Sequence, residues 1–403
     1  MKKMLSLFLV LCTVFFLAGC GTTLTPKEEL PPANKTAAPL PTEMVTEPEL
    51  HDKTPDPDDI VDNMTSENEE YEIAFITCAG VLKDRSFHQD TWDGIKLYAA
   101  ANNLSYKYYQ PATGSSATDS DRYDAIEAAV DGGASIVVCT GLQQEDALKE
   151  AAMEFTDTMF LFIDGYSLSD SEGNILPNVA GISFREEQSG YFAGFSAVME
   201  GFTRLGFCGG GDGLDPSCCR YGYGFVQGAS DAAEALGVPV KINYSWLHGS
   251  DYTGSSELQA MANRWYANGT EIIFTCGGTM LDSVAAAAAE NDGFVIGADR
   301  DQTPESDTVI TSALKNRSEA VIWALSKFYE GAWADIGGID TCLDIADGVV
   351  GLPTDTWKME NYTVEEYANA LSAVKSGKLV IDTEYPEDIT SLSTDLVTIK
   401  EIR

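Results

Sequence analysis

Two aspartates stand at the ends of apolar runs, where a carboxylate could bind a small molecule. Asp164 follows Phe-Leu-Phe-Ile, and Asp299 follows Phe-Val-Ile-Gly-Ala. Such runs are typical of buried β-strands, and in parallel sheets ligands bind where the strands end. A carboxylate at that edge would accept hydrogen bonds from hydroxyl or amino groups. Aspartate is also common there because it caps the following turn by local hydrogen bonds, so both interpretations stay open.

Cysteines near predicted strand ends are the next candidates for chemistry. They are Cys78, Cys139, Cys208 and Cys276. Such a set could suggest a soft-metal site, but free cysteine usually packs in cores as a small apolar group. The chain has no Cys-x-x-Cys motif and three scattered histidines, so a zinc site is not expected. Residues 209–213 lack the Gly-Lys-Ser/Thr of a phosphate-binding loop. We therefore expect no metal, no cofactor and no catalytic residue.

Short apolar runs alternate with amphipathic segments from residue 71 onward. The runs predict strands at residues 73–77, 136–139, 160–163, 179–184, 205–208, 240–244, 272–276, 294–296 and 309–314. The segments between them predict helices at residues 90–101, 123–130, 145–155, 187–199, 224–236, 257–266, 281–290 and 317–329. This alternation is typical of parallel sheets covered by helices. About ten strands exceed one comfortable core, so we expect an α/β protein with two sheets.

The charge of the chain restricts the classes of partner. The chain has 403 residues, with 63 Asp and Glu against 25 Lys and Arg, and a formal net charge of -38 at pH 7. Binding to nucleic acid needs Lys and Arg to neutralise phosphates, so nucleic-acid and anionic-lipid partners are excluded. At 44% apolar side chains, the chain is too hydrophobic to be disordered as a whole.

The N-terminal segment predicts an export signal, at residues 1–20. Lys2 and Lys3 precede an apolar run at residues 5–17, which is shorter than the ~20 residues of a membrane-spanning helix. The run ends in Leu-Ala-Gly-Cys, which resembles the lipobox of bacterial lipoproteins, so Cys20 is expected to carry the lipid. The alternative is a secretory signal cut near residue 19, with Cys20 left as an ordinary thiol.

Residues 21–70 are expected to form a disordered, acidic and Pro-rich tether. This stretch has thirteen Asp and Glu, three Lys, eight of the fifteen prolines and no aromatic residue. It cannot bury a core for lack of large apolar side chains. The folded part would therefore begin near residue 71.

The number of cysteines bears on disulfide bonding. Cys12 lies in the signal and Cys20 is expected to carry lipid, which leaves seven. An odd, unpatterned set favours free thiols over a disulfide framework. The adjacent Cys218 and Cys219 could oxidise, and their redox state stays open.

Several motifs, in order along the chain, resemble those of one protein family. Residues 84–94 read Asp-Arg-Ser-Phe-His-Gln-Asp-Thr-Trp-Asp-Gly, which resembles the signature Asp-x-Ser-Phe-Asn-Gln-x-x-Trp-x-Gly of the basic-membrane-protein family. These are substrate-binding lipoproteins of ABC transporters and include purine nucleoside receptors. Further matches lie at residues 184–187 (Phe-Arg-Glu-Glu), 220–225 (Arg-Tyr-Gly-Tyr-Gly-Phe), 296–302 (Ile-Gly-Ala-Asp-Arg-Asp-Gln) and 311–315 (Thr-Ser-Ala-Leu-Lys).

The resemblance implies a periplasmic-binding-protein type I fold, with two doubly wound parallel-sheet lobes joined by hinge strands. The N-terminal lobe would contain residues 71–183 and about 315–346. The C-terminal lobe would contain residues 184–314 and about 347–403. The hinge strands would lie around residues 179–184, 309–315 and 349–353.

The resemblance also implies roles for individual residues. Phe87 and Tyr252 would stack on the two faces of a planar base. Asp164 and Asp299 would accept hydrogen bonds from ribose hydroxyls. The remaining expected ligand-binding residues are Gly278, for close approach of the backbone, Lys315, for a ring or ribose acceptor, and His88.

Two departures from the family pattern fall in the expected site. Cys78 stands where the nucleoside receptors usually have an aspartate, and His88 where they have an asparagine. Losing those polar groups changes how a base edge is recognised. His88 would either bind the ligand or satisfy a loop carbonyl. We also expect a neutral ligand, because two acids and aromatic rings suit a neutral ring that carries hydroxyls better than a phosphate, which favours an arginine or a helix N-terminus.

The predicted function is a lipid-anchored, extracytoplasmic solute-binding component of an ABC importer. It would be a monomer that closes two lobes on a nucleoside-like small molecule and delivers it to a permease and its ATPase. The membrane would be contacted through the lipid anchor only. The alternatives are a ligand-sensing lipoprotein of the same fold and a nucleoside hydrolase that uses Asp164 or Asp299. The ligand and the permease stay open.

Overall fold

The computed structural model describes residues 55–78 and 82–403. The predicted export signal, the lipidated Cys20 and residues 21–54 of the predicted tether lie outside the described residues. None of the helices in the described part of the chain is both long enough and apolar enough to cross a membrane.

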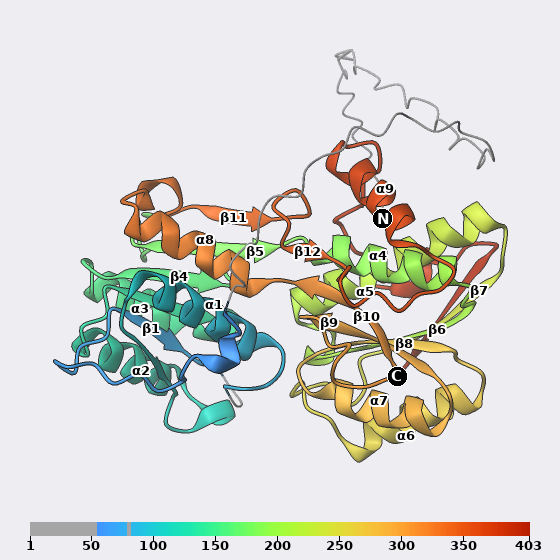
Figure 1. The fold of residues 1–403 in the computed structure, drawn as a ribbon, viewed down its shortest axis with the longest axis horizontal. Coiled ribbons are helices and arrows are strands. Elements are labelled where there is room, and N and C mark those ends of the chain that lie inside the picture. The colour runs from blue at the N-terminus through green and yellow to red at the C-terminus, as the bar shows by residue number, and fades with distance from the viewer. Residues whose placement is uncertain (1–54, 79–81) are drawn as a thin grey trace, which may run out of the picture. The chain divides into compact units, whose positions relative to one another are not determined.

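The first sheet is entirely parallel among its described strands. Its spatial order is β11 (Asp340–Leu343), β5 (Val179–Phe184), β4 (Met159–Ile163), β3 (Ile136–Thr140), β1 (Ile73–Ile76) and β2 (Tyr106–Tyr109). Alternate residues of the central strands pack on opposite faces, as the pleat requires. Phe75 packs with α1 (Phe87–Asn102) and α8 (Arg317–Tyr329), whereas Ile76 packs with α2 (Asp119–Asp131) and α3 (Glu145–Glu154). Helices therefore cover both faces (Figure 1).

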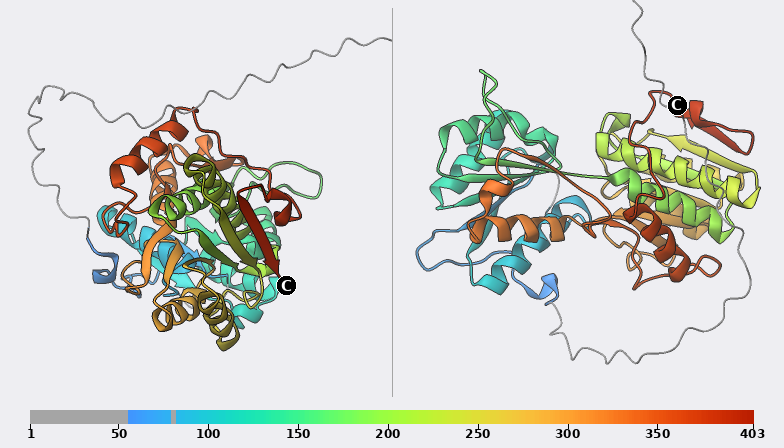
Figure 2. Two further views of the ribbon diagram at one scale, coloured as in Figure 1. Left: turned by 90° about the vertical axis from the view of Figure 1, so that its right-hand side faces the viewer. Right: turned by 90° about the horizontal axis from the view of Figure 1, so that it is seen from above.

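The second sheet is parallel except at one edge. Its spatial order is β12 (Val350–Gly351), β10 (Val309–Lys315), β9 (Phe294–Asp299), β8 (Ile272–Cys276), β6 (Arg204–Gly209), β7 (Val240–Ser245) and β13 (Val397–Ile402), with β12 antiparallel to β10. One face packs on α4 (Glu186–Glu200) and α5 (Pro216–Leu236), and the other on α6 (Ser256–Ala267) and α7 (Met280–Glu290). Further views show the helices that flank each sheet (Figure 2). The predicted α/β fold with two doubly wound lobes is confirmed.

The remaining elements are short or peripheral. Helix α9 spans Val364–Lys375, and the 3-10 helices are η1 (Pro57–Asp59), η2 (Gly114–Ser116), η3 (Leu142–Gln144), η4 (Gly211–Gly213), η5 (Trp333–Asp335) and η6 (Ile389–Leu392).

The chain passes between the lobes at three places in the described residues. These are residues 184–186 between β5 and α4, residues 315–317 between β10 and α8, and residues 343–350 between β11 and β12. The expected hinge segments adjoin these crossings. The expected lobe boundaries stay a prediction, and the membership of the two sheets supports them.

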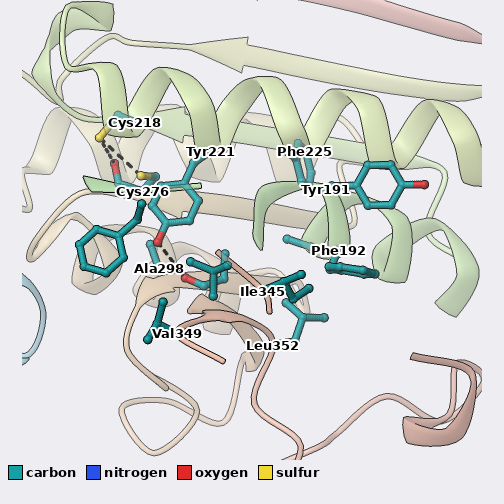
Figure 3. Packing of buried hydrophobic residues seen from close by; sticks show 14 of the residues in the cluster. Tyr191, Phe192, Cys218, Tyr221, Phe225, Cys276, Ala298, Ile345, Val349 and Leu352 are labelled. Atoms are coloured by element: carbon teal, nitrogen blue, oxygen red, sulfur yellow. Dashed lines mark hydrogen bonds between the residues drawn. The ribbon is translucent and has the colours of Figure 1, made fainter. Parts of the chain in front are cut away.

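Glycines bring α4 and α5 into backbone contact. A Cβ added at Gly194 would lie 2.0 Å from the carbonyl oxygen of Phe225, and one added at Gly228 would lie 1.9 Å from that of Tyr191. Either distance is far below any allowed contact, so only glycine fits these positions. Figure 3 shows Tyr191 and Phe225 of this helix pair among the buried hydrophobic residues.

The tether was predicted to extend too far, because residues from 57 onward pack on the first lobe. Lys96 of α1 is completely buried, and its amine donates to the carbonyl of Pro57 at 2.6 Å. The same amine pairs with Asp62 at 3.1 Å, and Trp92 donates its indole N–H to that carboxylate. A buried amine needs such partners, and the acidic segment supplies them.

Candidate ligand-binding site

The carboxylates of Asp164 and Asp299 lie where the sequence analysis placed them, at strand ends. Asp164 directly follows β4, and Asp299 is the last residue of β9. Both have left-handed backbone conformations, with φ angles of 56° and 72°. Aspartate tolerates this conformation better than most residues. Such strained positions gather at binding sites, where the surrounding structure holds them in place.

One guanidinium joins these carboxylates across the two lobes. Arg317 Nε lies 2.8 Å from Asp164 Oδ2, and Arg317 Nη2 lies 3.2 Å from Asp299 Oδ1. Only 2% of Arg317 is exposed. Its guanidinium carbon also lies 4.5 Å from the ring centre of Phe87, a cation–π contact. Arg317 thus connects three of the predicted ligand-binding residues.

Lys315 extends this arrangement of charges into the second lobe. Its Nζ lies 2.5 Å from Asp164 Oδ1 and 2.6 Å from Glu186 Oε1, and both Lys315 and Glu186 are completely buried. The hydroxyl of Ser217 donates to Glu186 at 2.9 Å, and Arg220 pairs with the other carboxylate oxygen. Burial opposes ionisation of Glu186, but the charges of Lys315 and Arg220 outweigh it and hold its pKa below the usual range.

The loop before α1 makes further contacts with the second lobe. Ser86 donates its hydroxyl to Asp299 Oδ2 at 2.7 Å. Arg85 pairs with Asp282 at 2.8 Å and with Glu305 at 2.9 Å. Because the Arg85 side chain is 42% exposed, these pairs are weaker individually than the buried ones. Together the contacts close the lobes on each other at this edge.

Tyr252 and Gly278 form a cluster in the second lobe. Tyr252 has a φ angle of 59°, and its hydroxyl donates to Asp215 at 2.8 Å. A Cβ added at Gly278 would lie 2.5 Å from the carbonyl oxygen of Tyr252, so the backbone there requires glycine. Gly278 was predicted to allow close approach of a ligand, and the close approach in the structure is to Tyr252. The stacking of a base between Phe87 and Tyr252 stays a prediction.

His88 adjoins Phe87, with the two rings edge to face and their centres 5.2 Å apart. Its ring contacts a thiol, a carboxylate and the backbone N–H of Cys78, which Nε2 accepts at 3.3 Å. The imidazole Nε2 lies 3.1 Å from Cys78 Sγ, and Nδ1 lies 3.1 Å from Asp84 Oδ2. The predicted contact between His88 and a ligand stays a prediction. In the part of the chain that the structure describes, His, Cys, Asp and Glu do not gather in a group that could hold a metal ion.

Arg317 and Glu186 were not among the residues expected in the site. Arg317 is the first residue of α8, where the helix dipole disfavours a cation. A cation at the start of a predicted helix therefore indicates, from the sequence alone, that acidic groups elsewhere hold the side chain. Arg317 contacts three of the expected site residues, Phe87, Asp164 and Asp299. Its guanidinium already pairs with Asp164 and Asp299, so it does not serve as a free phosphate-binding group.

Two sheet-based lobes, with charged side chains of both lobes meeting where the chain crosses between them, are the architecture of the periplasmic-binding type. Residues 72–383 match the family described as ABC transporter substrate-binding protein PnrA-like. The chain belongs to this family, and the resemblance seen in the motifs is confirmed.

Individual relatives agree with this assignment, and solved structures share the fold. The chain is 24% identical to the ABC transporter nucleoside-binding protein BmpA of Lactococcus lactis, over 76% of this chain and 88% of the relative. It is 28% identical to basic membrane protein B of Borrelia garinii, over 68% and 78% of the two chains. An ABC transporter solute-binding protein from Conexibacter woesei has the same fold, with a TM-score of 0.60, 18% identity and coverage of 78% and 99%. One from Aeropyrum pernix has a TM-score of 0.58, with 19% identity and coverage of 78% and 88%.

Proposed function

We propose that this substrate-binding protein captures a nucleoside-like small molecule between its lobes and delivers it to the permease of an ABC importer. The observation that carries the proposal is the convergence on Arg317. Phe87 and Asp164 come from the first lobe and Asp299 from the second, and one guanidinium contacts all three. A relative is named a nucleoside-binding protein, which supports the ligand class.

The contacts of the Arg317 guanidinium indicate which ligand groups would fit between Phe87, Asp164 and Asp299. It is flat, it stacks on an aromatic ring, and it donates N–H groups to a carboxylate of each lobe. A nucleoside offers the same features in one molecule, since its base stacks and its ribose hydroxyls donate. Such a ligand competes with the Arg317 side chain for the same partners. A ligand that bridges both lobes favours their closed state by its differential affinity.

The charge balance of the site supports an uncharged ligand. The acids Asp164, Glu186 and Asp299 are matched by cations, which are Lys315, Arg317 and Arg220. A net charge on the ligand would have no free partner in this set, and an unpaired buried charge is strongly unfavourable.

A thermal-shift screen tests the ligand class. The protein without residues 1–20 is heated with purine and pyrimidine nucleosides, free bases, ribose and riboflavin, because selective binding to the folded state raises the melting temperature. We expect a rise with nucleosides and none with ribose alone. Absence of any shift with nucleosides contradicts the ligand class and leaves the family assignment standing.

Substitutions test the site. Phe87→Ala and Asp299→Ala should abolish the nucleoside shift while the unliganded protein still melts cooperatively. Asp157→Ala, which removes an exposed carboxylate, is the matched control and should bind normally. Retained binding in either site variant would overturn the assignment. Recovery of the nucleoside unchanged after long incubation would speak against the hydrolase alternative.

The anchor is tested separately. We propose that the mature protein is extracytoplasmic, monomeric and attached to the cell membrane through lipid on Cys20. Cells grown with a radiolabelled fatty acid should label the wild-type protein and not Cys20→Ser. A labelled Cys20→Ser protein would show that the lipid is elsewhere.

A further inference from the structure

Cys78, His88 and Asp84 form a chain of contacts beside the candidate site. Cys78 lies just after β1, and His88 is in the first turn of α1. The Cys78 Sγ to His88 Nε2 distance is 3.1 Å, and the His88 Nδ1 to Asp84 Oδ2 distance is also 3.1 Å. Only 8% of Cys78 and 5% of His88 are exposed. A thiol, an imidazole and a carboxylate are therefore in series and shielded from water.

The carboxylate of Asp84 is held in place by the backbone. Its Oδ1 accepts N–H groups of Ser86 at 2.9 Å and of Gln89 at 3.2 Å, and its Oδ2 accepts that of His88 at 3.0 Å. With Nδ1 donating to this fixed carboxylate, Nε2 of the neutral ring is an acceptor. It faces the thiol of Cys78 at 3.1 Å and also accepts the backbone N–H of Cys78 at 3.3 Å. Asp84 is thus a positioning residue for the imidazole.

The electrostatics agree with this geometry. Burial lowers the pKa of His88, but the charge of Cys78 and the hydrogen bonds to Asp84 and Cys78 outweigh it and raise the pKa to about 10. Burial and the charge of Cys78 raise the pKa of Cys139. The rings nearest the imidazole are Phe87 and Phe75, and both are uncharged.

We infer that Cys78 is a reactive thiol, a modification site for small soft electrophiles and low-molecular-weight disulfides. The thiol proton moves to His88 Nε2 before attack, so that the sulfur attacks as a thiolate. With a disulfide, the Cys78 sulfur forms a new S–S bond, the old S–S bond breaks, and the leaving thiolate takes the proton from His88. Nothing is oxidised or reduced beyond this exchange.

The place of this thiol links it to the ligand site. A Cβ added at Gly141 would lie 3.3 Å from Phe87 Cζ and 3.5 Å from Cys78 Sγ, so the sulfur and the ring border the same small space. A group attached to Cys78 would change the surface beside Phe87. The inference goes beyond the proposed function, and its test needs no ligand.

The experiment measures the alkylation rate of each cysteine in the full-length protein. Iodoacetamide is added over a series of pH values, and peptide mass spectrometry follows the products. The exposed Cys342 serves as an internal reference. His88→Asn is the main variant, because it keeps a polar side chain of similar size, and a melting curve checks its fold. Asp84→Asn tests the positioning role.

We expect iodoacetamide to label wild-type Cys78 near pH 6.5, because His88 accepts the thiol proton. In His88→Asn the rate at Cys78 near pH 6.5 should fall by about tenfold or more, and its pH profile should return to that of an ordinary thiol. Asp84→Asn should shift the profile in the same direction by less. A small disulfide, 2-hydroxyethyl disulfide, should form a mixed disulfide at Cys78.

Two results would overturn the inference. An unchanged rate at Cys78 in His88→Asn would show that the histidine is merely structural. Failure to label Cys78 in the folded wild-type protein, while Cys342 is fully labelled, would show that the thiol is a core group like Cys139.

Discussion

The helix pair α4–α5 and the charged cluster around Arg317 are both tightly packed, but for opposite reasons. The helices lack side chains at their contact, whereas the cluster is made of long charged side chains. The helices meet because four glycines remove side chains, at Gly190, Gly194, Gly224 and Gly228. The Arg317 cluster, which consists of Asp164, Glu186, Asp299, Lys315 and Arg317, brings whole charged side chains together. Backbone contact stabilises without desolvating charge, whereas desolvation of buried ions offsets most of their attraction. The cluster is therefore better explained by what it positions than by stability.

The largest effect is expected in the helix pair. Gly228→Val places side-chain atoms against the carbonyl of Tyr191, where even a Cβ would lie 1.9 Å away. Either the helices separate or the protein does not fold, so the free energy of unfolding should fall by about 3 kcal/mol or more. Denaturant unfolding measures it. Ala235→Val adds the same side chain on the exposed side of α5, and should change stability by less than about 1 kcal/mol. Equal losses in both variants would refute the close-packing argument.

The next effect concerns the Arg317 cluster. Arg317→Met leaves Asp164 and Asp299 without their shared cation, and breaking a buried pair in this way should lower the free energy of unfolding by about 3 to 5 kcal/mol. If these ion pairs add little net stability, removing the charges of Asp164, Asp299 and Arg317 together should restore most of the loss, because Lys315 keeps its pair with Glu186. The triple variant Asp164→Asn, Asp299→Asn and Arg317→Met tests this in the same denaturation experiment. A triple variant as unstable as the single one would show that the ion pairs themselves stabilise the fold.

The same comparison shows what the sequence could predict. Central strands such as β3 and β8 are short apolar runs between turns, so their pattern is local and was found. The strand β2 was missed because Tyr-Lys-Tyr-Tyr lies at a sheet edge and is partly exposed. The start of α5 was placed too late, although Asp215 caps the helix and Pro216 begins it.

Only some of the residues that meet around Arg317 could be predicted from the sequence, and the reason is physical. Strand ends and motifs located Asp164 and Asp299 because each depends on its own sheet. The pairing of these acids with Arg317 joins residues 153 and 18 positions apart in the sequence, and only folding of both lobes brings them together. Local patterns carry no information on such a contact.

A smaller effect is expected from pH, because backbone contact between helices does not titrate. Asp90 of α1 is buried and accepts the backbone N–H of Arg317 at 2.7 Å. Burial raises the pKa of Asp90 to about 6, against the opposing charge of Arg317. The folded protein thus binds this proton more tightly than the unfolded chain, so the contribution of Asp90 to stability is complete below pH 3.8 and is lost as the pH rises through 6.

Asp90→Asn should remove that loss, which is on the order of 2 to 3 kcal/mol. Unfolding free energies measured across this pH range give the comparison with wild type. Glu186 should behave in the opposite way. Because its pKa is held below the usual 4.5, its contribution is present above that pH and is lost as the pH falls. Glu186→Gln should therefore abolish the loss of stability at acid pH. It should leave unchanged the loss of stability that Asp90 causes as the pH rises through 6. If both variants changed the stability over the same pH range, the assignment of separate pH ranges to Asp90 and Glu186 would be contradicted.

The smallest effect is expected in ligand affinity. If Arg317 occupies the partners of a nucleoside, a ligand must displace it, and part of the binding free energy is spent on breaking its contacts with Asp164 and Asp299. Arg317→Met, which keeps a long side chain without the charge, should then bind the nucleoside found in the screen about tenfold more tightly, a change of about 1.4 kcal/mol. Titration calorimetry with both proteins measures this. Lys327→Met, which removes a cation from the partly exposed pair with Asp335, is the control and should bind as wild type does.

The opposite result would also be informative about the cluster. Arg317 Nη1 is buried, and it has no hydrogen-bond partner within the described residues. If the nucleoside instead bonds to this nitrogen, Arg317→Met should weaken binding, because a buried donor that meets a ligand acceptor contributes affinity that methionine cannot replace. A weaker complex would thus reject competition and make Arg317 a direct ligand contact. Whether Arg317→Met strengthens or weakens nucleoside binding therefore decides whether Arg317 competes with the ligand or contacts it directly.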